Sequence, residues 1–507
     1  MVTVPKSSII NQEGLLMSET NRKSNVVLFC CDHLRADWLG CNGHPLVMTP
    51  QIDKLAAQGV TFQRAFSECP MCVPARRTMM TGLGPHGIRM FWNRDTQPFP
   101  EGPKLAEVMT RAGYQTFASG KLHTCPQRNR IGFEDVQLNE EGRRQEGLVK
   151  DDYDAFLEDH GCAHRAYAHG LGNNQYGLRL SPLPEPFTTT HWTAQKAMEF
   201  LERRDPTRPF FLYVSFDKPH PPITPPAEYY ELYREAQFPA PVMGDWVQER
   251  SPERVRRLRL TNDVDMIREH PLLLQQTLRG FAAMITHIDS MIGVILGQIR
   301  ELVGLRDTHV LFTSDHGDQL FDHGNAAKGD YFRGSPNVPL IVTPSARWRE
   351  EHAMRPGRVD RATPAGLMDI MPTILALCDV EAPGTIEGQS LLGRARDSAG
   401  DFRRYSFGRS DHSVAATDGR FVYQWFFTDD LEFLFDHDSD PREEHDLSTS
   451  EEHAATKKAL RGALQEWLTD KGDELVSGGE LVSRHGDRSF DPAGARSANC
   501  WNNRGRH

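Results

Sequence analysis

The sequence predicts an α/β fold in which helices cover both faces of a large, mainly parallel sheet, with a smaller α+β domain after it. Three continuous apolar runs, at residues 26–31, 210–216 and 310–314, have the composition of strands buried on both faces. Segments with a helical spacing of apolar residues separate these runs, and such alternation is typical of a parallel sheet. After about Leu392, short strand-like runs joined by turns replace the alternation.

The elements of the larger domain follow in chain order. The first strand ends at Asp32, and Thr49 and Gly59 are predicted to cap the ends of a helix that begins at Pro50. Downstream we expect a helix at 103–113, a strand at 114–118, a helix at 193–203, a strand at 210–216, a long amphipathic helix at 272–302, and strands at 310–314 and 338–343.

A segment rich in glycine, histidine and acidic residues interrupts this pattern at residues 132–186. We expect an irregular insertion there, and its part at 161–177 is predicted to shape a substrate pocket.

The C-terminal part predicts an antiparallel sheet with a closing helix. Strands are expected at 402–407, 413–417 and 420–427, and a helix at 457–467. The predicted domains are therefore a catalytic α/β domain at 25–392, a small α+β domain at 393–475 and a polar, glycine-rich tail at 476–507. The tail suggests a homo-oligomer, because such a segment can wrap a neighbouring subunit.

The overall charge bears on the kind of binding partner. The formal net charge of −11 over 507 residues argues mildly against nucleic acid as a partner.

The cysteines and the N-terminal residues bear on where the protein is found. The nine cysteines are odd in number, so we expect a reducing, cytoplasmic setting rather than a disulfide framework. Residues 1–23 lack the apolar core of a signal peptide, and we expect no run as long as a membrane span. Met17 is an alternative start.

Four residues with reactive side chains each follow the carboxyl end of a predicted strand: Asp32, Lys121, His220 and Asp315. In open α/β sheets, ligands bind at the carboxyl ends of the strands. If the strands are parallel, these residues converge at one edge of the sheet. A lone aspartate after a strand is more often a helix N-cap, so the prediction depends on all four together.

The segment Cys72-Val73-Pro74-Ala75-Arg76 reads as a nucleophile loop that enters a short helix ending at Gly82. The start of a helix favours anions and therefore a reactive thiolate. An unreactive buried or surface cysteine is the alternative for such a segment in isolation.

The pattern C-x-P-x-R followed by Thr81-Gly82 resembles the signature of the type I sulfatases of the alkaline phosphatase superfamily. In that family the cysteine is oxidised to formylglycine, and the hydrated aldehyde, a gem-diol, is the nucleophile.

Oxygen ligands at the strand ends suit a hard divalent cation. The resemblance implies that Asp32, Asp315, His316 and the modified Cys72 hold it, with Ca²⁺ expected first and Mn²⁺ or Mg²⁺ as alternatives. Many sulfatases have a second aspartate where this chain has His33. His33 could bind the metal, face the substrate or pack.

Sulfuryl transfer also needs positive charge and a proton for the leaving alcohol. Gly120-Lys121-Leu122-His123 resembles the G-K-x-H element of the family, and Lys121 and His123 lie two apart, on one side of an extended segment. The resemblance implies that Lys121 steadies the formylglycine and that His123 deprotonates its second hydroxyl. It also implies that Arg76 braces the site and Asp315 assists the attack, while His220 and Lys328 help the alcohol leave. His323 is a weaker pocket candidate, with a surface loop histidine as the alternative.

We therefore expect a sulfatase that hydrolyses the sulfate monoester of a small molecule or saccharide, after maturation by a formylglycine-generating enzyme. A phosphonate monoester or phosphodiester hydrolase on the same scaffold is the first alternative; His33 and His316 favour it, whereas Lys121 and His123 favour the sulfatase. A non-catalytic metal-binding scaffold is the second alternative, and the complete set of basic residues argues against it.

Overall fold

The computed structural model describes residues 23–142, 150–166, 168–252, 263–396 and 402–484. Its central sheet contains eight strands of the described chain, in the order β4 (Asp135–Leu138), β3 (Gln115–Gly120), β5 (Phe210–Pro219), β1 (Asn25–Asp32), β6 (Thr308–Ser314), β7 (Leu340–Thr343), β2 (Val60–Phe62) and β8 (Arg358–Asp360). Of these strands, β7 runs antiparallel to both of its neighbours, and the other pairs are parallel. The predicted fold class is confirmed.

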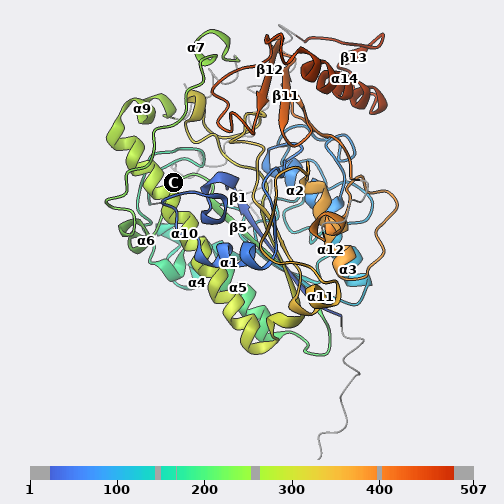
Figure 1. Ribbon diagram of the computed structural model, residues 1–507. Helices are drawn as coiled ribbons and strands as arrows, with labels where there is room; N and C mark the ends of the chain where they lie inside the picture. Colours follow the sequence, from blue (N-terminus) through green and yellow to red (C-terminus); the bar gives the residue numbers. More distant parts are fainter. Residues whose placement is uncertain (1–22, 143–149, 167, 253–262, 397–401, 485–507) are drawn as a thin grey trace, which may run out of the picture.

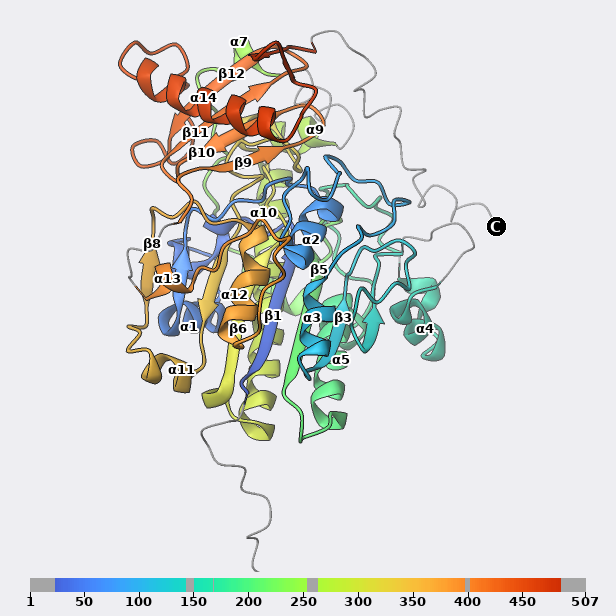
Figure 2. The ribbon, with the colours of Figure 1, turned by 90° about the vertical axis from the view of Figure 1, so that its right-hand side faces the viewer.

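Helices pack on both faces of this sheet (Figures 1 and 2). One face carries α1 (Pro50–Gln58), α5 (Thr189–Arg203) and α10 (Pro271–Leu302), and the other carries α2 (Cys72–Thr81), α3 (Leu105–Arg111), α11 (Ala346–Glu351) and α12 (Ile370–Leu377). Successive side chains of β1 alternate between the two cores: Val27 and Phe29 enter the first, Val26 and Leu28 the second. The continuous apolar run of β1 reflects burial on both faces.

α10 is the long helix predicted from apolar spacing. It is long and apolar enough, by length and composition, to cross a membrane, so the expectation that no segment approaches that length is wrong. Of its most apolar 18-residue window, 78% is buried inside the protein, as in the core helix of a globular domain.

The insertion is more regular than predicted. It contributes β4 at the edge of the sheet and α4 (Asp152–Asp159) beyond it. Asp151 accepts a hydrogen bond from the backbone N–H of Asp154 and so caps α4. Short helices α6 (Ala227–Glu231), α7 (Val247–Arg250) and α9 (Val264–Glu269) precede α10, and α13 (Leu392–Ala395) follows α12.

The C-terminal part forms a second, antiparallel sheet that lies above the carboxyl end of the first (Figure 2). Its described strands are β9 (Ser406–Arg409), β10 (Val414–Thr417), β11 (Phe421–Phe426) and β12 (Leu431–Asp436), and α14 (Ala454–Asp470) packs across them. β12 was missed in the sequence prediction. The hairpin of β13 (Val476–Ser477) and β14 (Glu480–Leu481) opens the predicted tail. Residues 485–507 and Met17 lie outside the described residues.

Candidate active site

The strand register brings the predicted residues to one edge of the sheet. Cys31 pairs with Ser314, and Gly120 pairs with Ser215, so that the residues after these pairs emerge side by side. Lys121 Nζ contacts Asp32 Oδ2 directly, although 89 residues separate them in sequence. His220 follows β5 and Asp315 follows β6 at the same edge.

Cys72 is the first residue of α2 and is fully buried. Its Sγ lies 3.0 Å from Lys328 Nζ, 3.2 Å from His316 Nε2 and 3.6 Å from Asp32 Oδ1. Burial raises the pKa of this thiol, but the positive charges of Lys328, Lys121 and His316 lower it by a larger amount. The pKa of Cys72 therefore lies well below its ordinary value. Position 72 therefore has an environment that stabilises negative charge.

The helix that carries Cys72 has well-defined ends. The backbone N–H of Val73 donates to Asn93 Oδ1 at 2.9 Å, which satisfies one of the donors left over at the start of α2. Gly82 ends the helix in the left-handed conformation, with φ +67°, and its N–H donates to the carbonyl of Thr78. These contacts fix Cys72 at the sheet edge.

Four side chains form a candidate cation site: Asp32, Cys72, Asp315 and His316. Their donor atoms all lie within 4.8 Å of one another, and all four residues are buried. Burial and the neighbouring Asp32 carboxylate raise the pKa of Asp315. A divalent cation fits here, because its charge would offset two crowded buried carboxylates.

Arg76 contacts both carboxylates, those of Asp32 and Asp315. Its Nε lies 2.8 Å from Asp315 Oδ2, and its Nη2 lies 3.5 Å from Asp32 Oδ2. Its Nη1 donates to the carbonyl of Lys121 and to Ser215 Oγ. A fully buried guanidinium with this many partners fixes the positions of the strand ends relative to one another.

Two glutamates after β4 hold the Gly120–His123 segment, and the sequence prediction missed both. Glu140 Oε1 accepts the backbone N–H groups of Leu122 and His123, at 3.0 and 2.8 Å. Glu141 Oε2 lies 2.9 Å from Lys121 Nζ, and its Oε1 lies 3.8 Å from His220 Nδ1. The only feature of the sequence that pointed to these two glutamates was that they form an acidic pair in the insertion.

His123 is paired with a carboxylate that the sequence prediction also missed. Its Nε2 lies 3.1 Å from Asp95 Oδ1, and its backbone has φ +57°, an uncommon conformation for a non-glycine residue. A hydrogen bond from His123 is among the interactions that lower the pKa of Cys72. His123 thus lies between position 72 and Asp95.

His33 contacts the site through a second buried network. Its Nδ1 is 2.9 Å from Asp318 Oδ2, its Nε2 contacts Lys328 Nζ, and its ring lies 4.1 Å from that of His220. Its donor nitrogen also groups with those of Asp32, Cys72 and His220. Asp318 accepts a further hydrogen bond from Tyr176 OH, at 2.5 Å. His33 therefore positions Lys328 and remains close enough to ligate.

His220 Nδ1 lies 2.6 Å from the carbonyl of Pro221, which only accepts, so Nδ1 carries the proton. Burial lowers the pKa of His220 to about 3. His323, by contrast, is neither a site residue nor on the surface. It is buried, packs against Trp246 and Phe332, and its Nδ1 accepts from the backbone N–H of Gly244.

The sequence pattern of the sulfatase family matches residues 24–380. The chain belongs to the sulfatase family. It is 31% identical to an arylsulfatase of Clostridium perfringens over 91% of this chain and 97% of that one. The sulfatase is therefore a sulfuric ester hydrolase, and family membership implies a divalent metal and a formylglycine.

Solved structures share the fold. A phosphonate monoester hydrolase of Agrobacterium radiobacter superposes with a TM-score of 0.75 at 23% identity, covering 91% of this chain and 100% of that one. A protein solved in complex with its substrate D-glucosamine-2-N,6-O-disulfate gives a TM-score of 0.69 at 20% identity, covering 89% of this chain and 99% of that one.

Proposed function

We propose that the sulfatase hydrolyses a sulfate monoester through a formylglycine formed from Cys72 by a formylglycine-generating enzyme. One observation carries the proposal: Cys72 Sγ, in a C-x-P-x-R segment, lies 3.0 Å from Lys328 Nζ and 3.2 Å from His316 Nε2. When formed, the formylglycine supplies a gem-diol hydroxyl as the nucleophile.

The surrounding side chains bind and orient the sulfate ester. Lys121 and Lys328 supply positive charge for the sulfate oxygens. Lys328 is the proton donor to the leaving alcohol. The Nδ1 proton of His220 is bound to the carbonyl of Pro221, and because burial lowers the pKa of His220 to about 3, its Nε2 carries no proton to donate. His123, held by Asp95, accepts a proton from the second hydroxyl at position 72, and Asp315 assists the first attack.

The cation is held by Asp32, Asp315, His316 and residue 72, and Ca²⁺ is our first choice, since two carboxylates dominate the donor set. It would supply positive charge at the sulfate oxygens.

Removal of the cation tests this assignment. Exhaustive chelation should abolish turnover, and titration with Ca²⁺, Mn²⁺ or Mg²⁺ should restore it, with Ca²⁺ most effective. Full activity of a metal-free sample, verified by elemental analysis, would contradict this assignment.

The natural substrate is proposed to be a sulfated small molecule or saccharide. The solved relative that carries D-glucosamine-2-N,6-O-disulfate supports the saccharide. A cytoplasmic location is proposed from the odd number of cysteines in the chain, nine in 507 residues, which does not suggest a disulfide framework.

The test of function compares two esters. Protein produced together with a formylglycine-generating enzyme should cleave 4-nitrophenyl sulfate with a higher kcat/KM than phenyl phenylphosphonate, and Cys72→Ser should abolish turnover of both. A higher kcat/KM for the phosphonate ester would mean that the protein is a phosphonate monoester hydrolase. The likeness in fold to the enzyme of Agrobacterium radiobacter is what supports that alternative. No turnover of either ester would favour the non-catalytic scaffold.

A further inference from the structure

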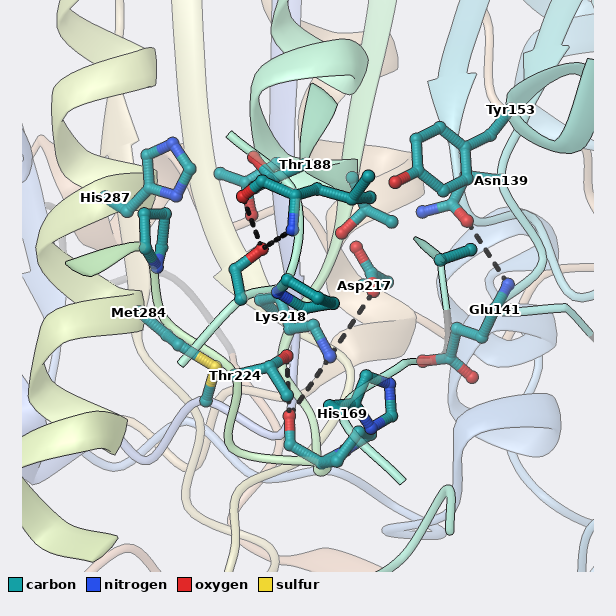
Figure 3. A pocket seen from close by; sticks show the side chains of 18 of the residues that line it. Asn139, Glu141, Tyr153, His169, Thr188, Asp217, Lys218, Thr224, Met284 and His287 are labelled. Atoms are coloured by element: carbon teal, nitrogen blue, oxygen red, sulfur yellow. Dashed lines mark hydrogen bonds and ion pairs between the residues drawn. The ribbon is translucent and has the colours of Figure 1, made fainter. Parts of the chain in front are cut away.

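The insertion contributes side chains to the surroundings of the active site from two of its parts. Figure 3 shows Glu141, from the segment after β4, and His169, from residues 161–177, at the wall of one pocket. Tyr176, from the same part as His169, lies deeper. It is 0% exposed and belongs to the core between the sheet and α10. Tyr176 therefore connects the insertion to the interior of the protein.

The hydroxyl of Tyr176 contacts the loop after β6 at two points. It donates to Asp318 Oδ2 at 2.5 Å, and its oxygen accepts from the backbone N–H of Ala327 at 2.9 Å. The same N–H lies 3.1 Å from Asp318 Oδ1. Ala327 has φ +64°, a left-handed conformation that a non-glycine residue keeps only where its surroundings enforce it. Tyr176 and Asp318 thus hold the residue directly before Lys328 in that conformation.

Asp318 also acts on the side chain of Lys328, through His33. A lysine ammonium group only donates hydrogen bonds, so His33 Nε2 accepts from Lys328 Nζ. His33 Nδ1 then carries the proton and donates it to Asp318 Oδ2 at 2.9 Å. Tyr176, Asp318 and His33 are each at most 1% exposed, so water does not compete for these hydrogen bonds. One hydroxyl therefore supports both the backbone and the ammonium end of Lys328.

Tyr176 is itself fixed by the core. Thr277 Oγ1 of α10 donates to the backbone carbonyl of Tyr176 at 3.0 Å. The ring of Tyr176 packs edge-on against Phe321, with 5.6 Å between the ring centroids. The position of Lys328 therefore depends on α10 and the insertion, and not only on the loop that carries it.

We propose that Tyr176 is a positioning residue for the proton donor Lys328, acting through the backbone of Ala327 and through the Asp318–His33 pair. As the oxygen at position 72 bonds to sulfur, the S–O bond to the alcohol breaks. The electron pair of that bond stays on the alcohol oxygen, which takes a proton from Lys328 Nζ. A misplaced Nζ leaves negative charge on this oxygen, and that costs most for alcohols of high pKa. The inference rests on the proposed function and adds the residues that determine which leaving groups the site accepts.

The test uses the mature enzyme and a series of ring-substituted phenyl sulfates, from 4-nitrophenyl sulfate, with an acidic phenol, to 4-methoxyphenyl sulfate, with a weakly acidic one. Tyr176→Phe removes only the hydroxyl. It should lower kcat/KM for 4-methoxyphenyl sulfate roughly tenfold, the loss expected for one hydrogen bond to a charged group. For 4-nitrophenyl sulfate the loss should be under about twofold, because that leaving group needs little protonation. The plot of log kcat/KM against the pKa of the phenol should therefore be steeper in the variant.

Tyr423→Phe is the matched control. Tyr423 is also 0% exposed and its hydroxyl also donates to a carboxylate, that of Glu432 at 2.7 Å, but it lies on β11 of the second sheet. This variant should keep the slope of the wild type. Asp318→Asn should steepen the slope as Tyr176→Phe does. The double variant should lose less than the two single losses combined, because both changes act through Lys328.

Amide hydrogen exchange measures the constraint without turnover, in protein whose Cys72 is unmodified. The peptide that contains Ala327 should exchange faster in Tyr176→Phe than in wild type or Tyr423→Phe. Unchanged exchange would show that the hydroxyl does not hold the loop, and an equal loss of kcat/KM for all the phenyl sulfates would show a purely structural role. Either result would overturn the inference. If the mature wild type cleaves no sulfate ester, the proposed function itself fails.

Discussion

At the scale of single residues, buried carboxylates determine where the basic groups of the site lie. Asp32 and Glu141 hold Lys121, Asp318 holds His33 against Lys328, and Asp95 holds His123. None of these acidic partners touches Cys72 at hydrogen-bond distance except Asp32, at 3.6 Å. Asp32 also belongs to the candidate cation site, whereas Glu141, Asp318 and Asp95 act on the reaction through the basic groups that they hold.

Asp95 provides a test of this view. Asp95→Asn should lower kcat by roughly ten- to a hundredfold with little change in KM, because His123 loses the carboxylate that orients it as a base. Steady-state kinetics on 4-nitrophenyl sulfate measure both constants, and Asp95→Glu should recover part of kcat. Asp135→Asn, on the exposed edge of β4, is the control. A rise in KM alone would assign Asp95 to substrate binding instead.

Sequence spacing could predict the residues at strand ends but not their acidic partners. Asp32, Lys121, His220 and Asp315 each follow an apolar run that identifies a strand, and parallel strands place their ends together. Asp95 and Glu141 lie in loops without such a periodic signal, and Asp318 meets His33 across 285 residues. Loop conformation depends on tertiary contacts, which no local pattern encodes.

At the scale of elements, the ends of α1 show how tertiary contacts replace local ones. Thr49 occupies the N-cap position, as predicted, but its side chain accepts no hydrogen bond from the first turn of the helix. Asp289 of α10 does so instead, through the N–H groups of Gln51 and Ile52 at 3.0 and 2.8 Å. The helix therefore begins where it was predicted to begin, but a carboxylate from a neighbouring helix, and not the Thr49 side chain, satisfies these donors.

The capping carboxylate makes stability depend on pH. Burial raises the pKa of Asp289 from 3.8 to about 6. Because the folded state then binds more protons than the unfolded state, this group lowers stability as the pH rises from 4 to 6, by about 3 kcal/mol in all. Asp289→Asn removes the titration. Urea unfolding at pH 4 and pH 7 should show the stability of the variant rising relative to wild type by about that amount. A difference that does not change with pH would contradict the assignment.

Strands buried on both faces were predictable, whereas edge and half-buried strands were not. β1, β5 and β6 lie in the middle of the sheet, and their apolar runs are continuous. β4 is an edge strand of four residues with an exposed Asp135, and its pattern resembles a loop. β12 begins with the partly exposed Leu431 and Glu432, directly after a turn, which hid its apolar second half.

At the scale of the whole molecule, the buried ion pair between Arg409 of β9 and Asp473, which follows α14, is joined to the loop after α2 through His86. Arg409 of β9 lies 3.0 Å from Asp473 Oδ2, and His86 Nε2 lies 2.6 Å from the same oxygen. The guanidinium also stacks on Phe91 and Phe427, at 4.5 and 4.7 Å from the ring centroids. The segment that leads from α2 toward Asn93 and Asp95 therefore packs against the second sheet.

Breaking this pair should destabilise the protein. Arg409→Met leaves the Asp473 charge buried without its guanidinium and should lower the free energy of unfolding by about 3–5 kcal/mol. The double variant with Asp473→Asn should lose less than the sum of the single changes. Urea unfolding checks both. Arg234→Met, which breaks an exposed pair with Glu231, should cost under about 1 kcal/mol. Additive losses in the double variant would show that the two residues do not interact.

The state of residue 72 in active enzyme tests the central claim most directly. Mass spectrometry of the peptide that carries position 72, from protein produced with and without a formylglycine-generating enzyme, gives the fraction of cysteine converted to the aldehyde. Turnover of 4-nitrophenyl sulfate should rise in proportion to that fraction and vanish where it is zero. Full turnover by protein in which residue 72 is entirely unmodified cysteine would contradict the account.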